Sequence, residues 1–149
     1  MRFFYLDTTA LVKHYHLELG SQAVDDLIGH LGHVVVLGEP SVADLYGLLN
    51  RRVEIGEITR DDYFTAMVTF EAEIAQNRLQ FLEVDPATLK NIRVLILKHN
   101  QLGVQQGLHL ALTMEMLTLK PTVVSTDPAL LLACEAEGLK IMNPEKEFP

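Results

Sequence analysis

Three aspartates, Asp7, Asp44 and Asp127, stand where an open parallel sheet would place a ligand site. Asp7 directly follows the apolar run Phe3–Leu6, and Asp127 comes two residues after Val123–Ser125. Asp44 falls in the first turn of a helix predicted to follow a second strand. Ligands of open parallel sheets bind beyond the carboxyl ends of the strands, and carboxylate oxygens are the ligands that Mg²⁺ or Mn²⁺ prefers. The sequence therefore predicts a candidate metal site made of these three aspartates.

Each of these acids also has a purely structural interpretation. Asp7 could cap a helix that begins near Thr8 or Thr9, and Ser41 to Asp44 fits the capping-box pattern. Asp127 and Asp85 each precede a proline, as an N-cap residue before a proline at the first helical position would. A helix N-terminus also favours an ionised carboxylate, so capping and metal binding are compatible. Spacing alone leaves both interpretations open.

The elements that must position these acids alternate along the chain. Short apolar runs predict strands at Phe3–Leu6, Val34–Leu37, Leu79–Val84, Thr122–Ser125 and Lys140–Met142. Segments of helical period lie between them, at Thr9–Leu17, Gln22–Leu31, Val42–Glu54, Arg60–Asn77, Ala87–His99, Gln105–Leu119 and Pro128–Glu137. We expect one α/β domain over residues 1–149, with a parallel sheet covered on both faces. The order of the strands does not follow from the pattern.

Three features support these helices in particular. Val42, Leu45, Leu49 and Val53 recur at spacings of three and four, and so do Leu89, Ile92 and Ile96. Gly56 and Gly138 stand where helix ends are expected. Thr59 and Asp62 fit a capping box at the start of the fourth helix.

Composition narrows the class of protein. The net charge of −8 excludes a general RNA or DNA coat, because phosphate neutralisation dominates the affinity of such proteins. A local basic rim or a carboxylate-held metal could still meet a phosphate chain. No apolar stretch is long enough for a membrane span, and the acid at position 7 comes too early for a secretory signal, so we expect a cytoplasmic protein. The single Cys134 excludes an internal disulfide and is expected in the core.

Four segments in register resemble the PIN domains, especially VapC-type toxins of prokaryotic toxin–antitoxin pairs. The opening Tyr5-Leu6-Asp7-Thr8-Thr9-Ala10-Leu11-Val12-Lys13 is similar to the start of these domains. Ser41–Leu45 with Leu48, Leu49 and Arg51 resembles their second motif, and Gly107–Ala111 resembles their third. Val123–Asp127 through Leu130, with Glu137-Gly138-Leu139 and Asn143-Pro144, resembles their closing segment. The resemblance implies a PIN-like three-layer fold, with a central parallel sheet of four to five strands flanked by helices.

The resemblance also implies an activity. It makes Asp7, Asp44 and Asp127 ligands of one or two Mg²⁺ or Mn²⁺ ions in an endoribonuclease that hydrolyses RNA phosphodiesters. The hydroxyls of Thr9 and Ser125 would be supporting groups at the same edge. Partners implied in this way are an RNA substrate, an antitoxin protein and a second copy of the chain. Homodimerisation would also bury an apparent excess of apolar side chains on the third and fourth helices, namely Tyr46, Tyr63, Phe64, Met67 and Phe70.

Two departures from the family pattern bear on catalysis. The second motif usually has Glu, and Asp44 shortens the reach to a metal by one methylene. The third motif usually has Asp where this sequence has Gln106, so one negative charge of the site is gone and metal affinity should fall. His109 lies three residues further on in an apolar helix, where a packed histidine is expected rather than a substitute ligand. We keep Gln106 with the catalytic candidates, in a reduced role.

Other polar residues near these motifs have more than one possible role. Lys13 and Arg51 could line the metal edge and contact phosphates, whereas Arg52 is expected on a solvated helix surface. In the cluster from His14 to His16, Tyr15 is expected in the core and both histidines at the surface.

Three function classes follow. The first is the metal-dependent endoribonuclease, and the second is a catalytically impaired PIN-like module that binds RNA or protein, motivated by Gln106. The third, phosphotransfer, is weaker: Asp7-Thr8-Thr9 is similar to the nucleophile loop of haloacid-dehalogenase-like phosphatases, but these need an acid where Thr9 stands. Neither a GxxxxGK[ST] loop nor a GxGxxG fingerprint is present.

Overall fold

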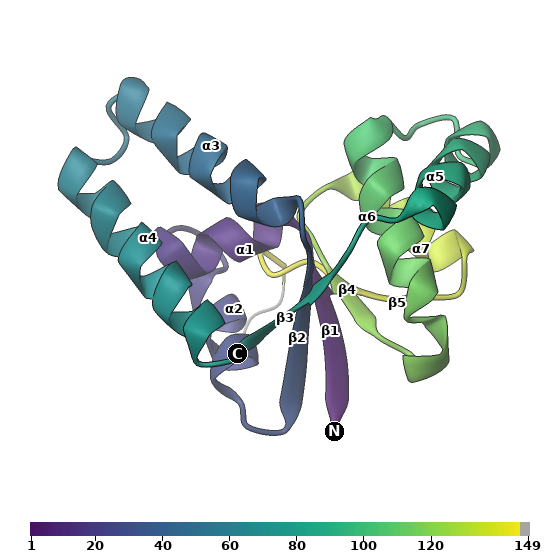
Figure 1. The fold of residues 1–149 in the computed structure, drawn as a ribbon, viewed down its shortest axis with the longest axis horizontal. Coiled ribbons are helices and arrows are strands. Elements are labelled where there is room, and N and C mark those ends of the chain that lie inside the picture. The colour runs from purple at the N-terminus through teal and green to yellow at the C-terminus, as the bar shows by residue number, and fades with distance from the viewer. Residues whose placement is uncertain (147–149) are drawn as a thin grey trace.

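The computed structural model describes residues 1–146, which form a central sheet with helices on both faces. Figure 1 shows the sheet nearly edge-on, with α1 to α4 on one side and α5 to α7 on the other. The strands are β1 (Arg2–Leu6), β2 (His33–Gly38), β3 (Leu79–Leu82), β4 (Thr122–Val124) and β5 (Lys140–Met142). The helices are α1 (Thr8–Tyr15), α2 (Ser21–Gly29), α3 (Ser41–Glu54), α4 (Arg60–Ala75), α5 (Pro86–Lys98), α6 (Val104–Glu115) and α7 (Pro128–Ala136). The expected three-layer α/β architecture is confirmed.

All strand pairs of this five-stranded sheet are parallel, in the order β3-β2-β1-β4-β5. In the register, Tyr5 lies between Val36 on one side and Val123 on the other. The chain thus starts in the middle of the sheet, builds outward to β3, and then returns to the opposite flank. Strand order reverses between β1 and β4, and such a switch point opens a crevice at the carboxyl ends of its two strands.

Alternation along each strand explains how both faces of the sheet are buried. Phe4 and Leu6 of β1 belong to the apolar cluster under α1 to α4, while Tyr5 between them belongs to the cluster under α5 to α7. In β4, Val124 and Val123 divide in the same way. Because successive side chains point to opposite faces, a continuous β-branched and aromatic run is what a sheet covered on both sides requires.

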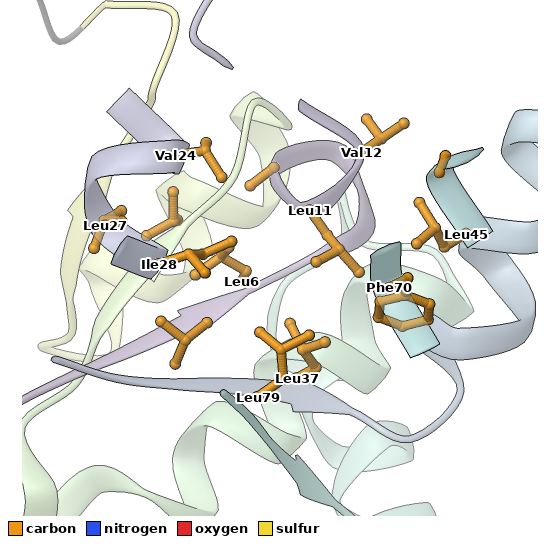
Figure 2. Close-up of a cluster of buried hydrophobic side chains, with 14 of the residues drawn as sticks. Leu6, Leu11, Val12, Val24, Leu27, Ile28, Leu37, Leu45, Phe70 and Leu79 are labelled. Atoms are coloured by element: carbon orange, nitrogen blue, oxygen red, sulfur yellow. The ribbon is translucent and has the colours of Figure 1, made fainter. Parts of the chain in front are cut away.

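The larger of the two apolar clusters fixes α1 against α3 and α4. Figure 2 shows Leu11 of α1 close to Leu45 of α3 and Phe70 of α4, above Leu37 of β2. Phe70 and Leu45 are fully buried, so truncating either to alanine should cost about 2–5 kcal/mol of folding free energy. This packing sets the position of the helix that carries Thr8 and Thr9.

Most of the predicted helix caps and helix-ending glycines are confirmed. Asp7, Asp85 and Asp127 each cap a helix with a carboxylate that accepts backbone N–H groups, and Thr59 with Asp62 forms a capping box. Gly56 and Gly138 follow the ends of α3 and α7 with φ of 78° and 84°, values that glycine adopts without strain. These local signals depend only on short stretches of sequence.

Three local predictions were wrong, one each in α3, α5 and α6. The capping box from Ser41 to Asp44 does not form: α3 begins at Ser41, its N-cap is Pro40, and no side chain caps it. Proline has φ preset near the helical value, so the helix starts one residue early and Asp44 is left free of a capping role. Leu89 is 60% exposed, because the Asp85–Thr88 capping box sets the phase of α5 so that Thr88, Ile92 and Leu95 face inward.

The sixth helix is also shorter than its apolar pattern suggested. It ends at Glu115, and a 3₁₀ turn over Leu117–Leu119 follows. No helix within residues 1–146 combines the length and apolar character needed to cross a membrane. The tail beyond residue 146 lies outside the described part of the chain.

Candidate active site at the carboxyl edge of the sheet

The structure brings most of the predicted site residues to one pocket of about 400 Å³ at the switch point between β1 and β4. Its lining includes every predicted aspartate and also Gln106, Thr9 and Arg51: the full set is Asp7, Thr8, Thr9, Asp44, Leu48, Arg51, Gly103, Val104, Gln105, Gln106, His109, Asp127 and Leu130. These residues come from the end of β1 and the start of α1, from α3, from α6 and its N-cap, and from the loop after β4 with the start of α7. The expectation that distant acids meet at one edge therefore holds as geometry, while their roles stay predictions.

Asp7 lies at the base of the pocket and is only 3% exposed. Its Oδ1 accepts hydrogen bonds from the Thr9 hydroxyl at 2.6 Å and from the Ala10 backbone N–H at 3.1 Å. Its Oδ2 accepts one from the Ser125 hydroxyl at 2.5 Å. Each carboxylate oxygen has two lone pairs, so Oδ2 keeps one acceptor position beyond these contacts.

Thr9 and Ser125 connect the two loops on either side of the switch point. The Thr9 hydroxyl accepts the backbone N–H of Thr126 at 2.9 Å, and the Ser125 hydroxyl accepts that of Asp127 at 2.9 Å. Each hydroxyl therefore donates to Asp7 and accepts from the β4–α7 loop. Both residues stand where supporting groups were expected, and their contacts fix the orientation of the Asp7 carboxylate.

Burial dominates the electrostatics beneath the pocket. It raises the pKa of Asp7, against the opposing effects of His109, the Ser125 and Thr9 hydroxyls and the Ala10 N–H. Burial lowers the pKa of His109, although the negative charges of Asp7, Asp44 and Asp127 act in the opposite direction. A buried carboxylate whose pKa is raised is one that a nearby cation would stabilise.

His109 is packed, as expected, and it also lines the pocket. Its Nδ1 lies 2.7 Å from the Tyr5 hydroxyl. Burial and the Asp7 charge raise the pKa of Tyr5 well above its usual value, so the phenol is protonated and its hydroxyl shares a hydrogen bond with the imidazole. Sequence reasoning placed His109 in the core but missed that the same helix turn brings it to the site.

Asp127 is engaged by both α7 and Gln106. Its Oδ1 accepts the backbone N–H groups of Ala129 and Leu130 at 3.0 and 3.3 Å. Its Oδ2 accepts the amide Nε2–H of Gln106 at 2.9 Å. The Gln106 carbonyl is used elsewhere, as the acceptor of the Gly103 backbone N–H at 2.5 Å. The glutamine that replaces the expected acid therefore presents donors, not an acceptor, to Asp127.

Asp44 and Arg51 line the pocket with charged side chains that have no partner among the described residues. Within residues 1–146, no hydrogen bond or ion pair engages the side chain of either residue. Asp44 is half-buried in the first turn of α3, and Arg51 is exposed two turns further along the same helix. The same wall of the pocket therefore offers one carboxylate and one guanidinium that have no partner within residues 1–146.

Lys13, in contrast, is not brought to the pocket. Its ammonium is 3% exposed and lies 3.0 Å from Glu18, 2.8 Å from Glu145 and 2.8 Å from the Leu19 carbonyl. Three acceptors satisfy the three donors of the ammonium, which ties α1 to the C-terminal segment. A contact between Lys13 and phosphate has no support in this arrangement.

The neighbouring polar cluster is also structural. Arg52 is 17% exposed and pairs with Glu18 at 2.7 Å, so its expected place on a solvated surface was wrong. His14 bridges Asp25 at 2.6 Å and Glu73 at 2.8 Å. Burial opposes the charged ring of His14, but the hydrogen bonds to Glu73 and Asp25 raise its pKa overall.

A divalent ion in this pocket would need oxygen ligands that converge on one point. Within residues 1–146, no three His, Cys, Asp or Glu side chains converge closely enough to enclose a metal ion. Mg²⁺ commonly takes only one or two carboxylates, together with waters and substrate phosphate, so full enclosure is not needed. Thr8 also contributes to the lining, but its hydroxyl oxygen is buried beneath the surface and has no hydrogen-bond partner within residues 1–146. The oxygen-rich pocket fits a hydrated Mg²⁺ or Mn²⁺ ion.

Comparisons with known proteins establish the fold. No family model matches the sequence, and no match was found among curated protein sequences. Solved structures do match: PAE2754 from Pyrobaculum aerophilum has a TM-score of 0.66 at 13% identity, over 95% of this chain and 83% of that one. FitAcB from Neisseria gonorrhoeae has a TM-score of 0.64 at 18% identity, over 97% and 99%.

A third structural neighbour is VapC20 from Mycobacterium tuberculosis, a sarcin–ricin loop cleaving toxin. Its TM-score is 0.65 at 14% identity, over 91% of this chain and 95% of that one. At such low identities the likeness concerns the fold alone. This chain thus has a VapC-like PIN-domain fold, as the sequence resemblance predicted.

Proposed function

We propose that the protein is a cytoplasmic, Mg²⁺- or Mn²⁺-dependent endoribonuclease, the toxin component of a toxin–antitoxin pair. The observation that carries this proposal is the meeting of Asp7, Asp44 and Asp127 around one pocket at the switch point of a VapC-like fold. Its structural neighbour VapC20 is a toxin that cleaves the sarcin–ricin loop. The whole of residues 1–149 is proposed to act as one domain.

In this proposal the three aspartates hold the divalent ion, with Asp7 fixed from below by Thr9 and Ser125. When bound, the ion supplies an acidified water and positive charge beside the phosphate. Asp44 has its carboxylate free to take part directly or through water. Arg51 offers its guanidinium to an RNA phosphate from the pocket wall, and neutral His109 keeps the base of the pocket free of a competing positive charge.

The test is cleavage of a labelled RNA by the purified chain, with and without Mn²⁺. We expect activity that requires the metal and falls at least about a hundredfold in Asp7→Asn, as loss of a central charge at a catalytic site does. Asp26→Asn is the matched control, because Asp26 is exposed on α2 and its side chain hydrogen-bonds, among residues 1–146, to Gln22 alone. Cleavage that survives in Asp7→Asn at the wild-type rate would refute the assignment.

We also propose an antitoxin protein and a second copy of the chain as partners. The homodimer is proposed from the apolar side chains of α3 and α4. Met67 and Phe70 are buried within the chain, whereas Phe64 is 59% exposed and is available to a second copy. Light scattering checks this part of the proposal. A monomer at micromolar concentration would contradict the homodimer and leave the chemistry of the pocket untouched.

A second candidate is a catalytically impaired PIN-like module that binds RNA or protein. The hydrogen bond from Gln106 to Asp127 favours it, because the amide occupies a carboxylate oxygen that a metal would use. Gln106→Asp separates the two candidates. If the wild type is inactive and Gln106→Asp gains metal-dependent cleavage, the fold has kept a nuclease scaffold without the chemistry. Robust turnover by the wild type rules the module out.

A further inference from the structure

Helix α4 presents a row of apolar and acidic side chains to solvent. Phe64 and Val68, one turn apart, are 59% and 69% exposed, although the opposite side of the helix is buried in the core. Asp61 stands three residues before Phe64 and Glu71 three residues after Val68, a spacing that puts all four side chains on one helix face. In the described part of the chain, Asp61 makes no ion pair or side-chain hydrogen bond, and Glu71 accepts only the Tyr46 hydroxyl. The four residues of this face form the acidic stripe.

Helix α5 presents the opposite combination. Leu89, Val94 and Leu97 are 60%, 61% and 77% exposed, whereas the other side of the helix packs in the core. Lys90 and Arg93 lie among them at helical spacing and are exposed. Within residues 1–146, neither cation makes an ion pair or a side-chain hydrogen bond. These five residues form the basic stripe, a local positive surface on a chain whose net charge is −8.

The two stripes lie on opposite sides of the molecule. Helix α4 belongs to the layer that covers one face of the sheet, and α5 belongs to the layer on the other face (Figure 1). The acidic stripe therefore cannot cover the basic stripe within one chain. A second copy of the chain, in contrast, carries the complement of each stripe.

The signs of the charges determine how two copies can pair. Packing α4 against α4 brings two acidic stripes together, and packing α5 against α5 brings two basic stripes together. Like charges that face one another at a contact oppose association. Packing α4 of one copy against α5 of another places carboxylates opposite cations and also covers the exposed apolar side chains of both helices.

The remaining cation near the acidic stripe does not change this balance. Arg60 donates to the Asn50 side chain at 3.0 Å and lies 3.6 Å from the Glu54 carboxylate, so its charge is directed toward α3. Asp62 adds no free charge to the stripe either, because it accepts the Thr59 backbone N–H in the capping box. The charges available to a partner on α4 are therefore those of the acidic stripe.

We infer that the acidic stripe of one copy docks on the basic stripe of another, so that copies of this chain associate head to tail. The inference rests on the proposed function only for the expectation of a second copy, and it goes beyond that function because both stripes lie outside the pocket. The two surfaces differ, so the contact has no two-fold symmetry, and a pair of copies keeps one free stripe of each kind. Association therefore continues beyond the dimer as concentration rises, into a ring or an open chain.

Sedimentation velocity of the full chain, between roughly 1 and 200 µM, tests this contact with one substitution in each stripe. Val68→Lys puts a cation into the acidic stripe, and Val94→Glu puts an acid into the basic stripe. Leu132→Lys is the matched control, because Leu132 is 61% exposed on α7, which carries neither stripe. We expect each stripe variant to weaken association at least about tenfold and the control to leave it unchanged. Thermal unfolding verifies that every variant is folded.

Mixing the two stripe variants distinguishes a head-to-tail contact from a symmetric one. Val94→Glu retains an intact acidic stripe and Val68→Lys retains an intact basic stripe, so we expect the equimolar mixture to associate although each variant alone is monomeric. Dissociation by only one of the two substitutions would reveal a symmetric dimer through that helix and overturn the inference. A mixture that stays monomeric would overturn it as well, and so would a wild type that is monomeric at about 200 µM.

RNA cleavage separates the failure of this contact from the failure of the proposed function. Neither Val68 nor Val94 lines the pocket, so both variants should cleave RNA at the wild-type rate. If the variants associate as expected while the wild type cleaves no RNA, the contact stands and the nuclease fails. If the wild type cleaves RNA with Mn²⁺ but the mixture of variants stays monomeric, the nuclease stands and the contact is wrong.

Discussion

Ser125 is the residue on which the geometry of the candidate site depends most, and Ser125→Ala removes its hydroxyl. The side chain is fully buried. Its hydroxyl donates to Asp7 Oδ2 at 2.5 Å and accepts the Asp127 backbone N–H at 2.9 Å. The substitution therefore takes a donor from a buried carboxylate and leaves a backbone N–H without its acceptor. Both losses occur next to the charge that the site needs.

The magnitude follows from these two contacts. A hydrogen bond to a charged group contributes about 1.5–3 kcal/mol, and an orphaned buried donor costs about 1–3 kcal/mol. Because the two effects share one hydroxyl and partly relax together, we expect Ser125→Ala to lower the free energy of unfolding by about 3 kcal/mol. Ser21→Ala is the matched control: Ser21 is 3% exposed, and its hydroxyl accepts Glu18 N–H at 2.9 Å and donates to the His16 carbonyl at 3.3 Å. Both of its partners are neutral, so a loss of about 1 kcal/mol is expected.

Urea unfolding at pH 7.5 in EDTA measures both variants. The excess cost of Ser125→Ala over Ser21→Ala reports the charge on Asp7, so it should shrink by at least about 1 kcal/mol when Asp7 is replaced by Asn in a double-mutant cycle. Equal losses for the two serine variants, or no coupling between Asp7 and Ser125, would refute the reasoning that Ser125 orients an ionised Asp7.

Three further predictions concern single groups. Because the pKa of His14 is raised in the folded chain, its ion pairs stabilise the fold fully below about pH 6.5 and lose their effect as pH rises through the folded pKa. His14→Gln should therefore be most destabilising at pH 5.5 and nearly neutral at pH 9. An equal loss of stability at both pH values, measured by urea unfolding, would count against this prediction. Burial raises the pKa of Cys134 to about 12, so a thiol reagent at pH 8 should label it only as fast as the protein unfolds, and rapid labelling of the native chain would contradict this. Tyr5→Phe leaves the Nδ1 of His109 without its hydrogen-bond partner and should cost about 1–2 kcal/mol, whereas an unchanged unfolding midpoint would show that the 2.7 Å contact contributes nothing.

The elements and most of their ends were predictable because their causes are local. Alternation in β1 and β4, the caps at Asp85 and Asp127, and glycines after helix ends each depend on a few neighbouring residues. Prediction failed where a neighbouring signal competed with the pattern. Pro40 started α3 before the residue that the capping-box pattern favoured, and the capping box at the start of α5 turned Leu89 outward.

The candidate site was predictable in its acids but not in its connections. Asp7, Asp44 and Asp127 could be placed at one edge from strand ends alone, because the carboxyl ends of parallel strands share that edge. Strand order was not available from the pattern, so neither was the contact of Thr9 with the loop after β4, 117 residues away. The pairing of Lys13 with Glu145 spans 132 residues and removed that lysine from the pocket.

The sequence does not indicate the role of residues whose contacts come from segments far away along the chain. Thr8 was named as part of a helix start and of the opening motif, and the lack of a partner for its hydroxyl emerges only in the folded chain. For Gln106, the sequence indicated a lost charge, and the structure adds that its amide donates to Asp127.

Calorimetric titration of Mn²⁺ into the metal-free protein tests the central claim, that the acidic pocket is a divalent-metal site, most directly. The account predicts saturable binding by the wild type, loss of binding in Asp7→Asn, and at least about tenfold tighter binding in Gln106→Asp, where a carboxylate replaces the amide at Asp127. Heats that are identical for the wild type and Asp7→Asn, with or without the added acid at position 106, would contradict it.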